Sequence, residues 1–370
     1  MLLLSVSKAE EIDDVLYLCH LFERGKSMRE LTLGKTGITV PQNGFGALPI
    51  QRRSVDDAVT ILRKAYEGGM LYFDTARAYS DSETKLGIAF EDIREKLYIA
   101  TKTTATTGDK VKEDLTTSLR ELRTDYIDLY QLHMVDKVYA PGDGTGVYES
   151  LLEAKEAGKI RHIGVTAHKI GVAFDLVKSG LYETLQFPFS YLSDERDFEL
   201  AKLCHESDMG FIAMKGMAGG LITRSDVAMA FLENYPYVLP IWGVQHESEL
   251  DEWLSYMDDT PAWTDEMREY IESEKKELAG DFCRGCGYCM PTCPVGISIN
   301  QCARMTLMLR RSPSEFWLSE HWLNEMKKID DCIGCGQCTA HCPYELDTPD
   351  LLKKNYEDYK QVLEGKVNVL

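Results

Sequence analysis

Two copies of one cysteine spacing constrain this chain more than any other feature of its sequence. In each copy a cysteine recurs three times at every third residue, and a fourth follows four residues later, directly before a proline. Three thiolates at this spacing can wrap a short loop around one iron–sulfur cubane, while the fourth reaches a second cubane. We therefore expect one [4Fe–4S] cluster on Cys283, Cys286, Cys289 and Cys342, and another on Cys332, Cys335, Cys338 and Cys293.

Zinc knuckles and disulfides are the alternative uses of these cysteines. Zinc sites usually take their ligands in two pairs, and not in a triplet followed by Cys-Pro. Disulfides fit poorly with a chain whose start, Met1 to Leu4, lacks the basic residues of a secretory signal, so a cytoplasmic location is expected. Over roughly its last hundred residues the chain resembles bacterial two-cluster ferredoxins, which implies a domain with two cubanes.

The composition argues against two classes of partner. The chain has 370 residues, 44% of them hydrophobic, which is enough for a large domain and a smaller one. Its formal net charge of −19 disfavours nucleic acid and anionic membranes. Its apolar runs are also far shorter than a membrane span. No nucleic acid and no membrane is therefore expected as a partner.

Short apolar stretches alternate with amphipathic ones along most of the chain, and this alternation predicts the main domain. Eight strand-then-helix units in roughly 210 residues match the count and size of a closed (β/α)8 barrel. A doubly wound open sheet is the alternative, but no Gly-x-Gly-x-x-Gly turn follows the first strand. The predicted strands are Gly44–Ala47, Leu71–Asp74, Leu97–Thr101, Tyr126–Leu132, Ile160–Val165, Thr184–Phe187, Gly210–Met214 and Val238–Trp242.

The chain is expected to divide into three parts. Residues 1–28 form an N-terminal extension with a helix at Glu10–Glu23, because apolar residues recur there on one helical face. Residues 29–263 form the barrel. Residues 264–370 form a smaller, mainly α-helical domain of the two-cluster ferredoxin type.

Four polar residues stand at or shortly after the ends of consecutive predicted strands. Asp74 ends the second strand, Lys102 and His133 follow the third and fourth, and Tyr79 lies in the loop after Asp74. Taken singly, each fits a structural role. Together they should converge at the barrel mouth, because barrel enzymes do their chemistry at the C-terminal ends of the strands.

Their chemistry suits the reduction of a carbonyl group. The carbonyl oxygen needs a proton, which Tyr79 could deliver if the Lys102 ammonium acidified its phenol, whose ordinary pKa is about 10. Asp74 would keep that ammonium charged and oriented. A positively charged His133 would hydrogen-bond the substrate oxygen and stabilise the developing alkoxide.

These residues lie in sequence strings that resemble the aldo-keto reductase family over about residues 29–255. The resemblance implies that Asp74, Tyr79, Lys102 and His133 are the family's catalytic tetrad. Together with the cysteines, it implies the iron–sulfur, ferredoxin-type branch of that family. The matching strings are Leu31-Thr32-Leu33-Gly34-Lys35-Thr36-Gly37, Tyr72-Phe73-Asp74-Thr75-Ala76, Thr101-Lys102-Thr103, Asp128-Leu129-Tyr130-Gln131-Leu132-His133 and Lys159-Ile160-Arg161-His162-Ile163-Gly164-Val165-Thr166.

The resemblance also implies nicotinamide-binding positions, and several of them depart from the family pattern. Thr166, followed by an alanine, stands where the family has Ser-Asn for the carboxamide, although the carboxamide contact Gln186 is retained. Lys215 begins the segment that is Ser-Pro-Leu in the family. The last segment, from Gly243, carries Glu249 where basic residues bind the 2′-phosphate. A carboxylate repels a phosphate but accepts from a ribose hydroxyl, so NAD(H) fits better than NADP, and tight nicotinamide binding is itself open.

Three functions follow from these patterns. The first is an iron–sulfur oxidoreductase that reduces a carbonyl or oxidises an alcohol, with Tyr79 as general acid and base and electrons from NAD(H), the clusters or both. The second is a reductase or reductive eliminase driven by the clusters, fed by a ferredoxin-like electron donor without a nicotinamide. The third is a non-catalytic electron-transfer module. For the enzymes the partner is a small-molecule substrate, and Arg77 and Lys215 alone suggest that it is anionic.

Overall fold

The structure, a computed structural model, describes residues 27–277, 282–285, 287–311, 314–342, 344 and 346–369. The predicted helix at Glu10–Glu23 and the predicted cluster ligand Cys286 lie outside these residues. Within them, no helix is both long and apolar enough to cross a membrane.

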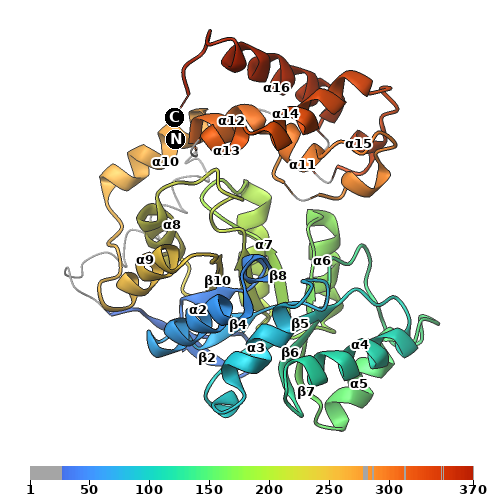
Figure 1. Cartoon of the computed structure of the whole chain (residues 1–370). Helices are drawn as coiled ribbons and strands as arrows, with labels where there is room; N and C mark the ends of the chain where they lie inside the picture. The colour runs from blue at the N-terminus through green and yellow to red at the C-terminus, as the bar shows by residue number, and fades with distance from the viewer. Residues whose placement is uncertain are drawn as a thin grey trace, which may run out of the picture.

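A closed barrel forms the larger part of the molecule (Figure 1). Within the described residues eight parallel strands pair in chain order, and the last strand returns to the first, with Trp242 opposite Phe45. The predicted (β/α)8 fold is therefore confirmed, and the doubly wound alternative is wrong, since an open sheet would leave two unpaired edges. The strands are β3 (Gly44–Gly46), β4 (Tyr72–Asp74), β5 (Tyr98–Thr103), β6 (Ile127–Leu132), β7 (Ile160–Thr166), β8 (Thr184–Pro188), β9 (Gly210–Met214) and β10 (Val238–Gly243).

A hairpin precedes the barrel and closes its N-terminal end. Strand β1 (Glu30–Thr32) pairs antiparallel with β2 (Thr39–Pro41), and Gly34 in the turn between them forms a bridge to Met209 just before β9. The hairpin residues Leu33 and Val40 are fully buried in a cluster with side chains of the barrel strands. Because this end is closed by apolar packing, any functional site of the barrel is expected at the opposite end.

Amphipathic helices surround the strands. In the first of them, α2, the side chain of Ser54 accepts a hydrogen bond from the backbone of Asp57, which is the usual N-cap arrangement. Its buried residues Ala58, Ile61 and Leu62 recur at helical spacing and face the barrel. The barrel helices are α2 (Val55–Glu67), α3 (Ser82–Phe90), α4 (Gly108–Glu121), α5 (Val147–Glu156), α6 (Ile170–Ser179), α7 (Glu195–Glu206), α8 (Ser225–Glu233) and α9 (Glu247–Asp258).

The C-terminal region has its own hydrophobic core and lies above the barrel in Figure 1. Tyr359 is fully buried there, and its hydroxyl donates to the backbone carbonyl of Trp317. The predicted cluster ligands Cys283, Cys289 and Cys338 belong to this same core. The helices of the region are α10 (Asp265–Glu277), α11 (Ile299–Cys302), α12 (Met305–Arg311), α13 (Ser314–Trp317), α14 (Glu320–Lys327), α15 (Gln337–Ala340) and α16 (Thr348–Leu363).

Buried polar contacts join this region to the loops at the C-terminal ends of the barrel strands. Arg311 of α12 donates to the carbonyl of Leu221 in the β9–α8 loop at 2.8 Å. Within the C-terminal region its guanidinium is held by both carboxylate oxygens of Glu274 in α10, at 2.6 and 2.9 Å. Between Gly219 of that loop and Gly285 of the first cysteine loop lies the guanidinium of Arg304. A side chain added at either glycine would collide with it. The cysteine-bearing region is therefore docked at the open end of the barrel.

Candidate active site and metal centres

Four of the predicted site residues come together at the open end of the barrel. Asp74 is the last residue of β4, Lys102 lies near the end of β5, and His133 directly follows β6. Tyr79 lies in the loop between β4 and α3. The three strands are neighbours in the barrel, so their ends lie side by side.

A buried ion pair forms the base of this group. The ammonium nitrogen of Lys102 lies 2.5 Å from a carboxylate oxygen of Asp74 and 2.6 Å from the carbonyl oxygen of Thr75. Both side chains of the pair are inaccessible to solvent, at 1% and 2% exposure. Burial, the largest single effect, lowers the pKa of Lys102, but the interactions with Asp74 and Tyr79 together outweigh it and the pKa is raised. Lys102 is therefore a fixed cation beneath the site.

Tyr79 lies over this cation. The Lys102 nitrogen is 5.1 Å from the centre of the Tyr79 ring, and it also interacts with the phenol oxygen. Burial raises the pKa of Tyr79, while the Lys102 charge opposes this, and the net direction is upward. The expectation that Lys102 makes the phenol more acidic than a free tyrosine is thus wrong, because removing the phenolate from water costs more than the ammonium returns.

His133 meets Tyr79 edge to face, with ring centres 5.7 Å apart. Burial and then the Lys102 charge lower the pKa of His133 to about 3. The expectation of a positively charged His133 is therefore also wrong, since burial and the nearby Lys102 charge both oppose its protonation. A neutral imidazole can still donate one hydrogen bond to a substrate oxygen.

Two buried glutamines connect the ion pair to the next strands. The side-chain amide of Gln131 donates to Asp74 at 3.3 Å and to the side-chain oxygen of Gln186 at 3.0 Å. Gln186, predicted to contact a nicotinamide carboxamide, is thus held in the same group. The hydroxyl of Thr166, the second such position, accepts from the backbone of Met134 at 2.7 Å. Sequence reasoning missed Gln131, although its place one residue before the end of β6 could have indicated it.

His168 is a further residue that sequence reasoning missed. It lies just beyond β7, 7% exposed, and its ring meets Tyr288 edge to face with centres 5.2 Å apart. Tyr288 belongs to the first cysteine loop. Burial, followed by the charge of Lys215, lowers the pKa of His168 to about 3. The first cysteine loop therefore covers part of the barrel mouth. No local sequence pattern indicates this contact.

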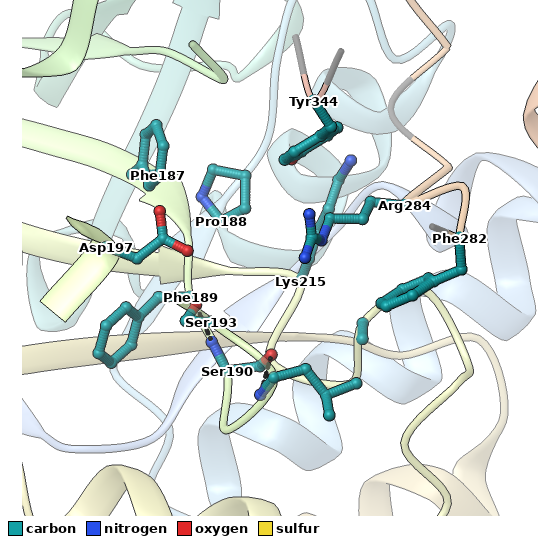
Figure 2. A pocket seen from close by; sticks show the side chains of 12 residues that line it. Phe187, Pro188, Phe189, Ser190, Ser193, Asp197, Lys215, Phe282, Arg284 and Tyr344 are labelled. Carbon is teal, nitrogen blue, oxygen red and sulfur yellow. Dashed lines mark hydrogen bonds between the residues drawn. The ribbon is translucent and has the colours of Figure 1, made fainter. Parts of the chain in front are cut away.

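The remaining predicted nicotinamide positions lie in other loops. Lys215 follows β9, has a left-handed backbone with φ 60°, and borders a pocket whose lining also includes Arg284 (Figure 2). Gly243, the last residue of β10, lies against the ring of Pro49. Glu249 accepts from the backbone amides of Gln245 and His246 at 2.7 and 3.0 Å, at the start of α9. The β10–α9 residues thus form a separate turn outside the group around Asp74.

Arg77, one of the two residues that suggested an anionic substrate, is already paired. Its guanidinium forms an ion pair with the buried carboxylate of Glu83. Its charge is therefore largely neutralised within the protein. Lys215 is left as the barrel residue that supports an anionic substrate.

The predicted ligands of the second cluster line a single pocket of about 350 Å³. Its walls otherwise consist mainly of apolar side chains. Cys293 comes from the first cysteine run, yet it borders this pocket together with three cysteines of the second run. The sulfurs of the described residues do not converge to metal-binding distance. The residues nevertheless fit a cubane, because soft thiolates in an apolar cavity form its usual environment. The four cysteines that line the pocket are Cys293, Cys332, Cys335 and Cys338.

The ligands of the other cluster are described only in part. Cys283 and Cys289 are buried and Cys342 is half-buried, while Cys286 lies outside the described residues. The backbone amide of Gly285 donates to the Cys283 sulfur at 3.4 Å. Gly285 and Gly287 both have positive φ angles, which turn backbone amides inward in a tight loop. An amide that donates to a thiolate sulfur is a contact that stabilises a cluster.

Comparisons with known proteins agree with both parts of this description. Residues 42–235 match the Aldo/keto reductase family, and residues 282–347 match a 4Fe-4S dicluster domain. Over 220 residues the chain is 30% identical to the uncharacterized oxidoreductase YqkF of Bacillus subtilis, covering 55% of this chain and 69% of that protein. It is 27% identical over 211 residues to L-galactose dehydrogenase of Arabidopsis thaliana, covering 52% and 66%.

Solved structures show the same barrel. Aldo-keto reductase AKR11C1 from Bacillus halodurans, in its holo form, superposes with a TM-score of 0.59 at 23% identity, over 67% of this chain and 96% of that one. An aldo-keto reductase from Klebsiella pneumoniae in complex with NADPH gives 0.56 at 19% identity, over 67% and 95%. The chain is an oxidoreductase that belongs to the aldo/keto reductase family and carries a 4Fe-4S dicluster domain in its C-terminal region.

Proposed function

We propose that this protein is an iron–sulfur oxidoreductase that interconverts a carbonyl and an alcohol, with Tyr79 as the proton-transferring residue. The observation that carries the proposal is the buried Lys102–Asp74 ion pair directly beneath the Tyr79 ring. A buried ion pair adds little to stability, because desolvation offsets its attraction. Its position under a phenol at the barrel mouth is better explained by a proton transfer that it assists.

Each residue of the group has a part in that transfer. As hydride reaches the carbonyl carbon, Tyr79 gives its proton to the oxygen and becomes a phenolate. The Lys102 ammonium stabilises the phenolate only as it forms, which is the interaction that lowers a barrier. Asp74 holds the ammonium in place, and Gln131 holds Asp74. The neutral His133 donates a hydrogen bond to the substrate oxygen and keeps it near Tyr79.

The nicotinamide positions fit NAD(H) in part. When bound, NADH supplies the hydride. Gln186 is placed beside the group around Asp74, which suits a carboxamide contact. Glu249 accepts from the backbone amides of Gln245 and His246, directly before the N-terminus of α9, where a 2′-phosphate would bind. The carboxylate both occupies these amides and repels a phosphate.

We therefore expect NADH to bind at least about tenfold more tightly than NADPH, a difference of about 1.4 kcal/mol. Glu249→Gln should reduce this ratio, because the amide side chain removes the repulsion while keeping one acceptor for the cap. Anaerobic titrations of both nucleotides against the cluster-loaded protein measure the ratio. Glu247→Gln, on the same helix turn, is the matched control. A preference for NADPH in the unchanged protein would contradict the assignment.

The cluster ligands are proposed as the cysteine spacing and the shared pocket indicate. Cys293, Cys332, Cys335 and Cys338 would hold one [4Fe–4S] cluster, and Cys283, Cys286, Cys289 and Cys342 the other. When bound, the clusters store and relay single electrons. The assignment of Cys293 to the cluster of the second run has direct support, because Cys293 lines the same pocket as three cysteines of that run.

Cys293→Ala tests this crossing. It should lower the iron content of reconstituted protein from about eight to about four per chain and remove the cluster of the second run. The same loss should follow from Cys335→Ala, whereas Cys289→Ala should remove the other cluster. Iron analysis together with EPR of the reduced protein distinguishes the two clusters. If Cys293→Ala and Cys289→Ala removed the same signal, the crossed ligand assignment would be wrong.

A second candidate function is reduction driven by the clusters alone, with electrons from a ferredoxin-like donor. The contact between Tyr288 of the first cysteine loop and His168 at the barrel mouth favours it, because it brings the first cluster loop to the candidate active site. Tyr79 and Lys102 would then deliver protons during stepwise electron transfer. Adding NADH to the oxidised, cluster-loaded protein under anaerobic conditions tests both functions. Bleaching of the visible cluster absorption by NADH supports nicotinamide use, and bleaching only by a one-electron donor supports the second function.

A further inference from the structure

A buried arginine lies between the barrel and the first cysteine loop. Arg304, shortly after α11, is 5% exposed. Its Nε and Nη2 atoms donate to the side-chain oxygen of Gln301 at 3.1 and 2.8 Å. The third nitrogen, Nη1, is also buried, and among the described residues it has no hydrogen-bond partner. No carboxylate in that part of the chain forms an ion pair with this guanidinium.

This arrangement is unfavourable unless an anion completes it. A buried charge is retained in proteins when it is paired, and an unsatisfied buried donor costs further stability. Arginine cannot avoid the cost by releasing its proton, because its guanidinium stays charged in proteins. The structure therefore requires a negatively charged acceptor next to Nη1 of Arg304.

The first cysteine loop identifies that acceptor. A Cβ atom added to Gly285 of this loop would lie 3.0 Å from both Cζ and Nη1 of Arg304. The backbone amide of Gly285 donates to the sulfur of Cys283 at 3.4 Å. The same sulfur is 3.8 Å from the carbonyl oxygen of Asn300, in the helix that precedes Arg304. The guanidinium and the proposed cluster ligand Cys283 therefore meet at the same loop.

The barrel closes the other side of the guanidinium. A Cβ atom added to Gly219, in the β9–α8 loop, would lie 2.8 Å from Nη1 of Arg304. Gly219 and Gly285 have φ angles of 68° and 67°, in the left-handed region that favours glycine. Backbone from both parts of the chain thus packs directly against the guanidinium and keeps water away from it.

The pocket of the second cluster has no comparable cation. None of the described residues that line it is charged. Cys335 in that pocket is exposed, so water reaches this side of it. Water and a fixed cation both stabilise the reduced, more negative form of a cluster. The cation has the larger effect when its site excludes water, because the low dielectric strengthens its field.

We propose that Nη1 of Arg304 donates to a sulfur of the first [4Fe–4S] cluster, and that the arginine charge holds the reduction potential of this cluster above that of the second. The inference rests on the proposed cluster ligands and goes beyond the proposed reaction. An electron from a one-electron donor would pass from the reduced second cluster to the oxidised first one, with no bond made or broken. It would then reside on the cluster whose loop, through Tyr288, contacts the barrel mouth.

A potentiometric titration of the cluster-loaded protein, followed by EPR and without substrate, tests the inference. In Arg304→Gln the ratio of reduced to oxidised first cluster at a fixed solution potential should fall by about tenfold, which is about 59 mV for one electron. Arg304→Lys keeps the charge and should change the ratio much less. Arg310→Gln is the matched control, because it removes a half-buried guanidinium of α12 that Asp358 already neutralises. It should leave the first potential unchanged.

A second measurement does not depend on how well Arg304→Gln assembles its clusters. In the unchanged protein the first cluster should have the higher midpoint potential. Cys335→Ala and Cys289→Ala, which should each keep one cluster, assign the two midpoints. A lower or equal midpoint for the first cluster would overturn the inference.

Two results with the arginine variants would also overturn it. One is an unchanged first potential in Arg304→Gln at full iron content. The other is an equal fall in Arg304→Lys, which would attribute the fall to packing and not to charge. No substrate is present in these titrations, so a failure of the proposed carbonyl reaction would leave their results unaltered. Iron content separately reports a failure of the proposed cluster ligands.

Discussion

Tyr79→Phe is expected to lower kcat for carbonyl reduction by about a hundredfold to ten-thousandfold, which is the usual contribution of a general acid. The substitution removes one oxygen atom and leaves the aromatic ring against His133 and Lys102. Folding and iron content should therefore be unchanged. The reaction would lose its proton donor, and water admitted to the site would replace it poorly.

The measurement is steady-state turnover of a carbonyl compound, with iron content and EPR recorded on the same preparation. Tyr98→Phe is a matched control, because Tyr98 begins β5 at the sealed end of the barrel. It should retain full activity. Equal turnover of Tyr79→Phe and the unchanged protein would remove the tyrosine from the mechanism, whatever the state of the clusters.

The pH dependence of carbonyl reduction should also reflect the state of Tyr79 and His133. Because the pKa of Tyr79 is raised above its ordinary value of 10, kcat/KM for reduction should show no alkaline decline from this group until above pH 10. The pKa of His133 is lowered to about 3, so His133 remains neutral and should produce no inflection near pH 6.5. An acidic inflection that disappears in His133→Gln would show that the imidazole is charged after all.

Lys102→Met should be the most damaging single change in the barrel. It leaves the Asp74 carboxylate buried with Gln131 and without its cation, and breaking a buried pair in this way costs about 3–5 kcal/mol. Tyr79 would also lose the charge that stabilises its phenolate. We therefore expect both a lower urea midpoint for barrel unfolding and a loss of turnover.

A double variant separates these two effects. In Lys102→Met combined with Asp74→Asn no buried charge remains unpaired, and replacing a whole buried pair is often close to neutral for stability. The urea midpoint should therefore return most of the way to that of the unchanged protein, while turnover stays low. Turnover restored along with stability would mean that the pair serves only the fold. Stability that stays as low as in Lys102→Met would mean that the cost lies in packing and not in charge.

The barrel and the cysteine pattern were readable from the sequence because both are set by local spacing. Strands such as Gly210–Met214 are short apolar runs between amphipathic stretches, and their count and length are typical of a closed barrel. The ends of β4, β5 and β6 must then lie side by side, so Asp74, Lys102 and His133 could be brought together before any coordinates were known.

The electrostatic character of the site was not readable in the same way. The sequence suggested an acidified Tyr79 and a charged His133, since it shows which charges are near but not how little water reaches them. Burial is set by residues distant in the chain, including Tyr288, which covers His168 from the cluster domain. At Tyr79, desolvation raises the pKa by more than the Lys102 charge lowers it. At His133, desolvation and the Lys102 charge both lower the pKa.

The amino-acid sequence alone determined the two-part architecture, the residues of the barrel mouth and the cysteines able to bind two clusters, because each depends on spacing along the chain. Only the tertiary structure decided the protonation of those residues and the docking of the cluster loops over the mouth. It also created the pocket that Lys215 and Arg284 share, since 69 positions separate them in the chain. Desolvation and long-range contacts depend on how distant segments pack, which no local pattern records.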